Sequence, residues 1–290
     1  MKQLLIEILN GVNINRKKKI NKDYKNCFIS NENSNKKIIH IIITPFMIEF
    51  IKRNGFDKIL YKKEYIENGI RVMKKYLFPS LKYQICKDFI WMLSLGEKAN
   101  ITYIKSLLNF KMPFKFIILY FKDMRNFIRN ITKKADILIT TRMDYDDRIY
   151  FDAVNDVRKK VNVSKPIFLH GYHRGFYYYE KFNIYTEFYR HYNNQGAIGI
   201  FESLIIVLNK VKDSYYIYDL GAHTLIRATL LKKYKKFGLK KLDYEPAFFE
   251  KDTPKFVYVR QHYSVFYRFY MKPKGKIVNF DLNKFYGIKK

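Results

Sequence analysis

The sequence predicts an α/β fold in which a mostly parallel sheet is flanked by helices. Four apolar, β-branched segments alternate with helical segments along the first half of the chain, which is typical of parallel strands joined by crossover helices. Hydrophobic residues make up 48% of the 290 residues, enough to bury a sizeable core. The second half changes to short aromatic-rich segments, so we expect a smaller, mixed part there.

The strands expected in the first half are continuous apolar runs, as found in sheets buried on both faces. They are Ile38–Thr44, Asp88–Leu95, Phe114–Phe121 and Ala135–Thr141. The spacing of apolar residues between them predicts helices at Met47–Lys52, Ile66–Gln84, Asn100–Phe110 and Met124–Lys133. Pro79 is expected to bend or end the second of these helices.

The second half predicts a more varied series of elements. Helices are expected at Ile149–Val161, Phe201–Val211 and Thr224–Phe237. Strands are expected at Lys165–Leu169, within Gly175–Tyr192, at Tyr215–Asp219 and at Phe256–Arg260. We find no internal repeat and no linker. The chain is therefore interpreted as a variable extension (1–37) followed by one domain (38–290) with halves 38–147 and 148–290.

The charge of the chain is strongly positive, with 56 Lys and Arg against 26 Asp and Glu, a formal net charge of +30. This charge suits nucleic acid, an anionic membrane surface or a phosphate-bearing small molecule. Lysine outnumbers arginine, which is the better reader of bases, and we find no glycine-rich phosphate loop, helix-turn-helix or zinc-finger pattern. We therefore expect no nucleic-acid partner.

The sequence favours a cytoplasmic location. We find no signal peptide and no apolar run long enough for a membrane span, and two cysteines, Cys27 and Cys86, suit a reduced compartment. The lysine-rich segments Lys232–Lys241 and Lys272–Lys276 are compatible with a place at the inner face of the membrane, on anionic lipid.

Three aspartates, Asp144, Asp146 and Asp147, follow directly after the expected strand Ala135–Thr141. Two unit charges about 4 Å apart repel by roughly 4 kcal/mol at an effective dielectric constant near 20, so the cluster needs compensation. Hard divalent cations prefer carboxylate oxygens, and ligands of open parallel sheets bind beyond the carboxyl ends of the strands. The pattern therefore indicates Mn²⁺ or Mg²⁺ clamping a diphosphate. The alternative is an acidic turn in which Asp147 caps the next helix.

The residues around this cluster resemble a known family. The string TTRMDYDD, Thr140–Asp147, resembles the TRLDNDD signature of bacterial rhamnosyltransferases, which are glycosyltransferases of the GT-A type. Upstream, Arg71 with LFPSL at Leu77–Leu81 and Gln84 resembles the Arg…PSL…Q helix of the family, and Phe89–Leu93 resembles the strand that follows it.

Downstream similarity is looser, at Asn193–Glu202 and at His223 with its following threonine. The resemblance implies a GT-A-like (Rossmann-like) fold, a nucleotide-sugar donor linked to dTDP, UDP or GDP, and a saccharide or lipid-linked acceptor in the synthesis of a surface polysaccharide or glycoconjugate. Met143 and Tyr145 stand where the signature has Leu and Asn, which leaves the sugar open.

The resemblance also implies roles for individual residues. The metal ligands would be Asp144, Asp146 and, after the expected strand Phe256–Arg260, His262. Asp147 would support the site or face the sugar. The donor-binding residues would be Thr44, Arg71, Arg142, Asp144 and His223.

An inverting transfer needs a carboxylate that deprotonates the acceptor hydroxyl, whereas a retaining transfer does not. Glu202, at the start of the expected helix Phe201–Val211, is the predicted base, with Glu187, Asp219 and Glu245 as alternatives. A nucleotidyl- or phosphotransferase could use the same acidic cluster, and a basic nucleic-acid-binding protein is a less favoured third alternative.

Overall fold

The computed structural model describes residues 35–48, 60–109, 111–172, 174–189, 201–211, 216–220, 248–250, 254–260, 273 and 275–288. Its first sheet contains β1 (Ile38–Phe46), β2 (Ile90–Leu95), β3 (Lys115–Tyr120), β4 (Ile137–Arg142), β6 (Ile167–Tyr172), β9 (Ser203–Val207) and β10 (Phe248–Glu250). Its second sheet contains β5 (Arg148–Ile149), β7 (Arg174–Tyr179), β8 (Ile184–Tyr189), β11 (Phe256–Arg260) and β12 (Ile277–Val278).

The helices are α3 (Lys63–Lys75), α4 (Leu77–Lys82), α5 (Ile101–Leu107), α6 (Met124–Thr132), α7 (Ala153–Lys159) and α9 (Leu282–Phe285). Single 3₁₀ turns are η3 (Phe121–Asp123), η4 (Glu180–Phe182), η5 (Leu208–Lys210) and η6 (Ile217–Leu220).

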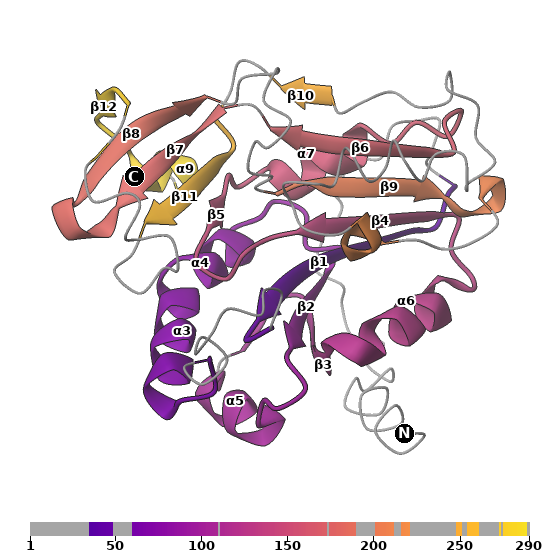
Figure 1. Ribbon diagram of the computed structural model, residues 1–290. Helices are drawn as coiled ribbons and strands as arrows, with labels where there is room; N and C mark the ends of the chain where they lie inside the picture. The colour runs from indigo at the N-terminus through magenta and orange to yellow at the C-terminus, as the bar shows by residue number, and fades with distance from the viewer. Residues whose placement is uncertain are drawn as a thin grey trace.

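The first sheet has the strand order β10-β6-β9-β4-β1-β2-β3 (Figure 1). The pairs β1·β2, β1·β4, β2·β3 and β6·β10 are parallel, while β9 runs antiparallel to both of its neighbours, β4 and β6. The α/β class with a mostly parallel sheet is therefore confirmed. So are the four strands expected in the first half.

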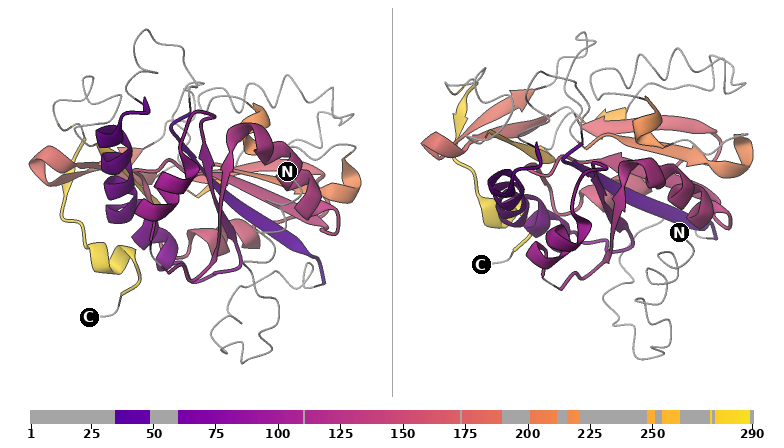
Figure 2. Two further views of the ribbon diagram at one scale, coloured as in Figure 1. Left: turned by 90° about the horizontal axis from the view of Figure 1, so that it is seen from below. Right: turned by 60° about the horizontal axis from the view of Figure 1, so that its bottom comes forward.

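Both faces of the first sheet are covered. Ile42 and Phe46 of β1 pack with α3, α4, α5 and α7, whereas Ile41 and Ile43 point to the other face, where α6 and η6 pack. Figure 2 shows this layering from two further directions. Gly69 lets α3 approach the end of β1, since a Cβ there would lie 2.5 Å from Cε2 of Phe46.

The smaller mixed part expected in the second half is the second sheet, with order β12-β8-β7-β11-β5. It lies beside α3 and α4 in Figure 1. A third apolar cluster joins the two regions, with Val72 and Tyr76 from the α3–α4 junction packed with Tyr178, Val257 and Phe285. Strands β6 and β9 join the first sheet although they follow β5 in the chain, so the two sheets interleave in sequence.

Two predicted elements of the second half are wrong. Phe201–Val211 is not a helix, because Ser203–Val207 forms β9 between β4 and β6, with every residue of the strand buried. Tyr215–Asp219 is not a strand where the structure describes it, since residues 217–220 form η6. There Ile217 N donates to Oγ1 of Thr140 at 2.9 Å, and Tyr216 N donates to the Asp219 carboxylate, which favours a turn.

Two other helices have different bounds from those expected. The helix expected from Ile149 begins only at Ala153, because Ile149 pairs with β11. The helix expected over 66–84 is split at Tyr76, three residues before Pro79, whose ring excludes the carbonyl of the residue four positions earlier. The helix at 224–237 lies outside the described residues, as does most of the one at 47–52.

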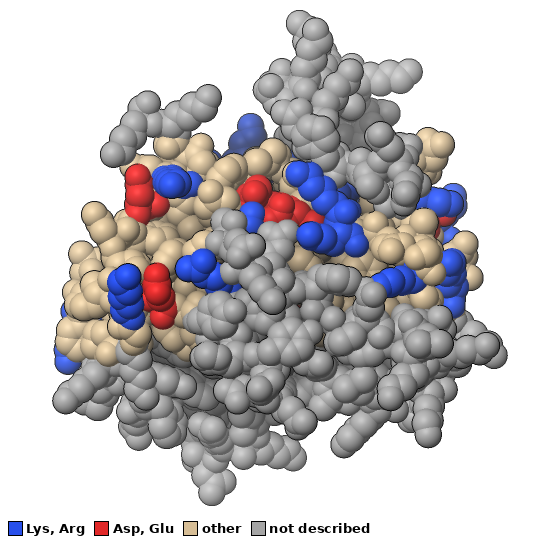
Figure 3. All heavy atoms as spheres, turned by 90° about the horizontal axis from the view of Figure 1, so that it is seen from above, with Lys and Arg blue, Asp and Glu red and all other residues tan. Residues whose placement is uncertain are grey.

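Within the described part of the chain, none of the helices has the length and hydrophobicity of a membrane span. On the face seen in Figure 3, the acidic side chains in view have basic side chains beside them, with uncharged residues between these groups. The described residues on this face therefore form no large patch of a single charge.

Candidate functional site

The three aspartates lie on a tight turn, residues 143–147, which we call the acidic turn. Met143 N donates to Ile43 O at 3.0 Å, so the turn starts beside the end of β1. Asp147 N donates to Asp144 O at 3.3 Å, which closes the turn before β5 begins. The acidic turn therefore lies at the carboxyl ends of β1 and β4, where open α/β sheets bind ligands.

The three carboxylates differ in their surroundings. The Asp144 side chain is 28% exposed and Asp146 is half-buried. Asp147 is buried, and its Oδ1 accepts a hydrogen bond from Val259 N of β11 at 3.4 Å. The alternative in which Asp147 caps a helix is wrong, because β5 follows it and α7 begins only after Asp152.

Arg142 brings two of the predicted site residues together. Its Nε and Nη2 donate to Oδ1 of Asp144 at 3.3 and 3.0 Å, and its backbone N donates to Glu202 O at 2.9 Å. The guanidinium lies 5.6 Å from the ring centroid of Tyr218. Burial alone would lower the pKa of Arg142, but Asp144, Tyr218 and Glu202 together raise it. Arg142 is therefore a fixed cation between the acidic turn and the start of β9.

The phenol side chains of Tyr145 and Tyr65 lie near Asp144 and Asp146. The ring of Tyr145 packs edge-on against Phe46 at 5.3 Å, and its hydroxyl is hydrogen-bonded to that of Tyr65 on α3. Burial, the charge of Asp146, the Tyr65 hydroxyl and the charge of Asp144 all raise the pKa of Tyr145 well above 10. Asp144 and Asp146 thus lie around a phenol that stays protonated at neutral pH.

The other predicted residues lie in varied places. Thr44 is buried and its Oγ1 accepts a hydrogen bond from Trp91 Nε1 at 3.1 Å. Arg71 is exposed on α3, where its Nη2 donates to Asn68 Oδ1 at 2.7 Å. Glu202 is 2% exposed and precedes a strand instead of opening a helix. His223 and His262 lie outside the described residues.

Among the alternative bases, Glu187 is exposed on β8, and Asp219 forms an ion pair with Arg125. Glu245 lies outside the described residues. Among the candidate bases that the structure describes, the charge of Glu202 raises the pKa of Arg142 beside the acidic turn.

The acidic turn suits a divalent cation that is shared with a substrate. Within the described ranges, no three His, Cys, Asp or Glu side chains gather in a way that could hold a metal ion. Mg²⁺, however, is usually bound through one or two carboxylates together with substrate phosphates. Asp144 and Asp146, both half-buried, are hard oxygen donors of this kind.

Sequence reasoning missed the aromatic and basic surroundings of the acidic turn. Tyr65 and Tyr218 carry no sequence signal in a chain with 26 tyrosines. Arg148 carried a weak sequence signal, because this basic residue directly follows the three aspartates of residues 144–147.

The first sheet is an open α/β sheet with the acidic turn beyond its central strands. This places the protein in the class of open α/β proteins whose ligands bind at that edge of the sheet. The family model described as "Putative rhamnosyl transferase" matches residues 52–200, more than half of the chain and including the acidic turn. The chain belongs to this family of sugar transferases, and the GT-A-like fold class expected from the resemblance is confirmed.

Several solved structures are similar to the chain. TarS from S. aureus matches at 12% identity and a TM-score of 0.36 over 77% of this chain and 36% of TarS, so this chain spans about a third of TarS. TarS 1-349 in complex with UDP matches at 11% identity and a TM-score of 0.37, over 76% of this chain and 60% of that chain.

A putative nucleotide-diphospho-sugar transferase from Desulfovibrio desulfuricans G20 matches at 12% identity and a TM-score of 0.34, over 75% of this chain and 83% of that chain. TM-scores of this size are too low to support a functional argument. No curated protein matches the chain in sequence.

Proposed function

We propose that the protein is a metal-dependent glycosyltransferase. It would move a sugar, rhamnose by analogy with the family, from a dTDP-, UDP- or GDP-linked donor to a saccharide or lipid-linked acceptor of a surface polysaccharide or glycoconjugate. One observation carries this proposal. The family match includes an acidic turn whose half-buried Asp144 and Asp146 lie at the carboxyl ends of β1 and β4. We propose a cytoplasmic location at the inner face of the membrane, where the protein could reach a lipid-linked acceptor.

In the proposed site, Asp144 and Asp146 hold Mn²⁺ or Mg²⁺, with His262 as a third ligand. The ion would neutralise charge on the departing nucleoside diphosphate. Arg142 orients Asp144 through two contacts that both use Oδ1. A carboxylate held in this way is oriented before the ligand binds, which lowers the entropic cost of binding.

Glu202 is the proposed base for an inverting transfer. It directly precedes β9, the strand next to β4, and its backbone O accepts a hydrogen bond from Arg142 N. Since Glu202 is 2% exposed, the base role requires that its carboxylate become accessible when donor and acceptor bind. The charge of Glu202 is one of the causes that raise the pKa of Arg142, so the two side chains interact electrostatically.

The test compares two aspartate variants in the same assay. We expect Asp146→Asn to abolish Mn²⁺-dependent binding of the nucleotide sugar and release of nucleoside diphosphate. Asp136→Asn is the matched control, because Asp136 precedes β4 at the opposite edge of the sheet. Its Oδ2 accepts a hydrogen bond from Lys37 N at 2.7 Å, which an amide oxygen can also accept.

Thermal-shift measurements with a panel of dTDP-, UDP- and GDP-sugars and Mn²⁺ identify the donor. Unchanged turnover in Asp146→Asn would contradict the metal site, and release of pyrophosphate would instead support nucleotidyl transfer. In the same assay, Glu202→Gln is expected to lower kcat while donor affinity is retained. Wild-type turnover in that variant would exclude Glu202 as the base.

A further inference from the structure

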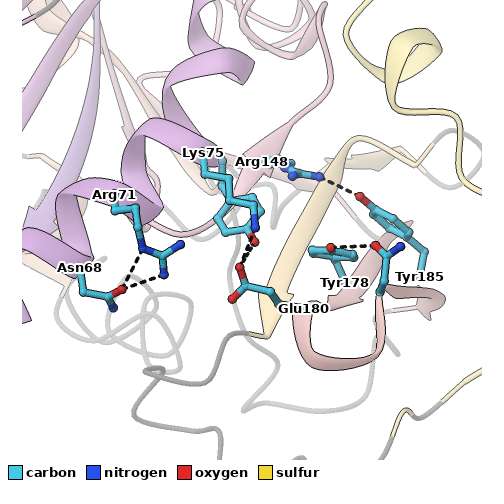
Figure 4. Close-up of polar contacts among 9 residues, drawn as sticks. Asn68, Arg71, Lys75, Arg148, Tyr178, Glu180 and Tyr185 are labelled. Carbon is cyan, nitrogen blue, oxygen red and sulfur yellow. Dashed lines mark hydrogen bonds and ion pairs between the residues drawn. The ribbon is translucent and has the colours of Figure 1, made fainter.

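Arg148 follows the acidic turn directly and is the first residue of β5. It is 4% exposed, and its guanidinium lies 4.6 Å from the ring centroid of Tyr76 and 5.5 Å from that of Tyr178. Its Nη1 donates a hydrogen bond to the Tyr185 hydroxyl at 2.9 Å (Figure 4). One side chain thus contacts the α3–α4 junction, β7 and β8.

This buried charge has no carboxylate partner among the residues that the structure describes, and its Nε has no hydrogen-bond acceptor there. One indirect link to a negative charge runs through Tyr76. The Tyr76 ring lies against the guanidinium, and its hydroxyl donates to Glu180. Glu180 also accepts a hydrogen bond from Lys75 at 2.8 Å, as Figure 4 shows. A buried cation without an ion pair costs free energy of folding, so packing alone does not explain an arginine here.

Neighbouring side chains of β5 point to opposite sides. Ile149 belongs to the core between the first sheet and α7, while the Arg148 guanidinium lies among the tyrosines of the third cluster. Asp147, one residue earlier, accepts from Val259 N of β11. The end of the acidic turn therefore has contacts on both sides. The Arg148 contacts with Tyr76 link it to the α3–α4 junction, in addition to the Tyr145–Tyr65 hydrogen bond to α3.

We infer that Arg148 is a positioning residue of the donor site, which holds the acidic turn between the α3–α4 junction and the second sheet so that Asp144 and Asp146 are oriented for the metal and the diphosphate. The inference rests on the proposed function. A buried cation that orients a binding site at a cost in folding stability can be told from one that stabilises the fold by replacing it. Its replacement by an apolar side chain of similar length preserves or raises stability and weakens binding of the ligand.

The experiment measures thermal stability and binding of dTDP, UDP and GDP with Mn²⁺ by calorimetry. For Arg148→Met we expect an unchanged or higher Tm, together with nucleotide affinity lower by on the order of tenfold, as found when groups that support metal ligands are removed. Tyr185→Phe, which removes only the hydroxyl that accepts from Arg148, should weaken binding less and leave Tm close to that of the wild type.

The matched control is Arg158→Met. Arg158 is a buried arginine on α7 that donates to both the backbone O and the carboxylate of Asp88, at 2.8 and 2.7 Å. Its loss should lower Tm and leave the nucleotide affinity of the folded protein unchanged.

Wild-type affinity in Arg148→Met would overturn the inference. So would a loss of affinity accompanied by a fall in Tm like that of Arg158→Met, because Arg148 would then be a structural residue. A wild-type protein that binds none of the three nucleotides with Mn²⁺ would contradict the proposed function, and the inference with it.

Discussion

A buried histidine is expected to make the stability of the protein depend on pH below neutrality. His40 of β1 is 1% exposed, and its Nε2 shares a hydrogen bond of 2.8 Å with Thr141 Oγ1 on β4. That hydroxyl shares a second one, of 2.7 Å, with Ser203 Oγ on β9. Burial, and then the charge of Arg158, lower the pKa of His40 well below 6.5. The folded protein therefore holds His40 neutral where the unfolded chain would protonate it.

The size of the effect follows from linkage between protonation and folding. Below about pH 6.5 the unfolded state binds one more proton than the folded state, so acid favours unfolding. The contribution of His40 is fully present above this pH and declines as pH falls through the unfolded pKa toward the folded one. As long as His40 stays neutral in the folded protein, the free energy of unfolding falls by about 2 kcal/mol between pH 7.5 and pH 5.

The assay is urea unfolding at several pH values, followed by the fluorescence of Trp91, the one tryptophan of the chain and fully buried. His40→Gln keeps a side chain that can hydrogen-bond to Thr141 but does not titrate, so the loss of stability toward pH 5 should shrink by about 2 kcal/mol. Thr141→Val is the control and should lower stability by about 1–3 kcal/mol at every pH. An identical pH dependence in His40→Gln and wild type would refute the reasoning.

Two further substitutions test contacts that hold the elements around the acidic turn. Lys255 donates to Asp152 at 2.8 Å and lies 2.6 Å from an oxygen of Asp156, so Lys255→Met should cost about 3–5 kcal/mol in urea unfolding by removing a buried cation that contacts both carboxylates. A cost below about 1 kcal/mol would show that solvent screens this group. In Gly96→Ala the new Cβ would lie 2.1 Å from the Met47 carbonyl oxygen, so we expect a loss of about 1–3 kcal/mol, and unchanged stability would contradict this close approach.

The parallel part of the first sheet could be predicted because each strand is a continuous apolar run between helical segments. The same property made Ser203–Val207 ambiguous, since a short apolar run has no period that separates a strand from a buried helix. Its neighbours β4 and β6 decide the matter by supplying hydrogen bonds on both sides. A two-residue strand such as Arg148–Ile149 has no local signal and exists only through its pairing with β11.

The candidate site was predictable where it is local in sequence. Asp144 and Asp146 could be found because they are two residues apart and follow a strand. The contacts of Arg148 with Tyr76 and Tyr178 could not be found, because they join segments far apart in a chain with 26 tyrosines.

The distribution of charge around the acidic turn bears on what a metal ion would do there. Sequence reasoning proposed the ion because three neighbouring aspartates repel one another. In the structure Asp144 is paired with Arg142, and Asp147 accepts from Val259 N and faces the second sheet. The protein's own groups therefore offset part of this repulsion, and we expect the turn to fold without an ion. A divalent cation that arrives with a diphosphate would then contribute to ligand binding and only little to folding stability, as in sites that share their metal with substrate phosphates.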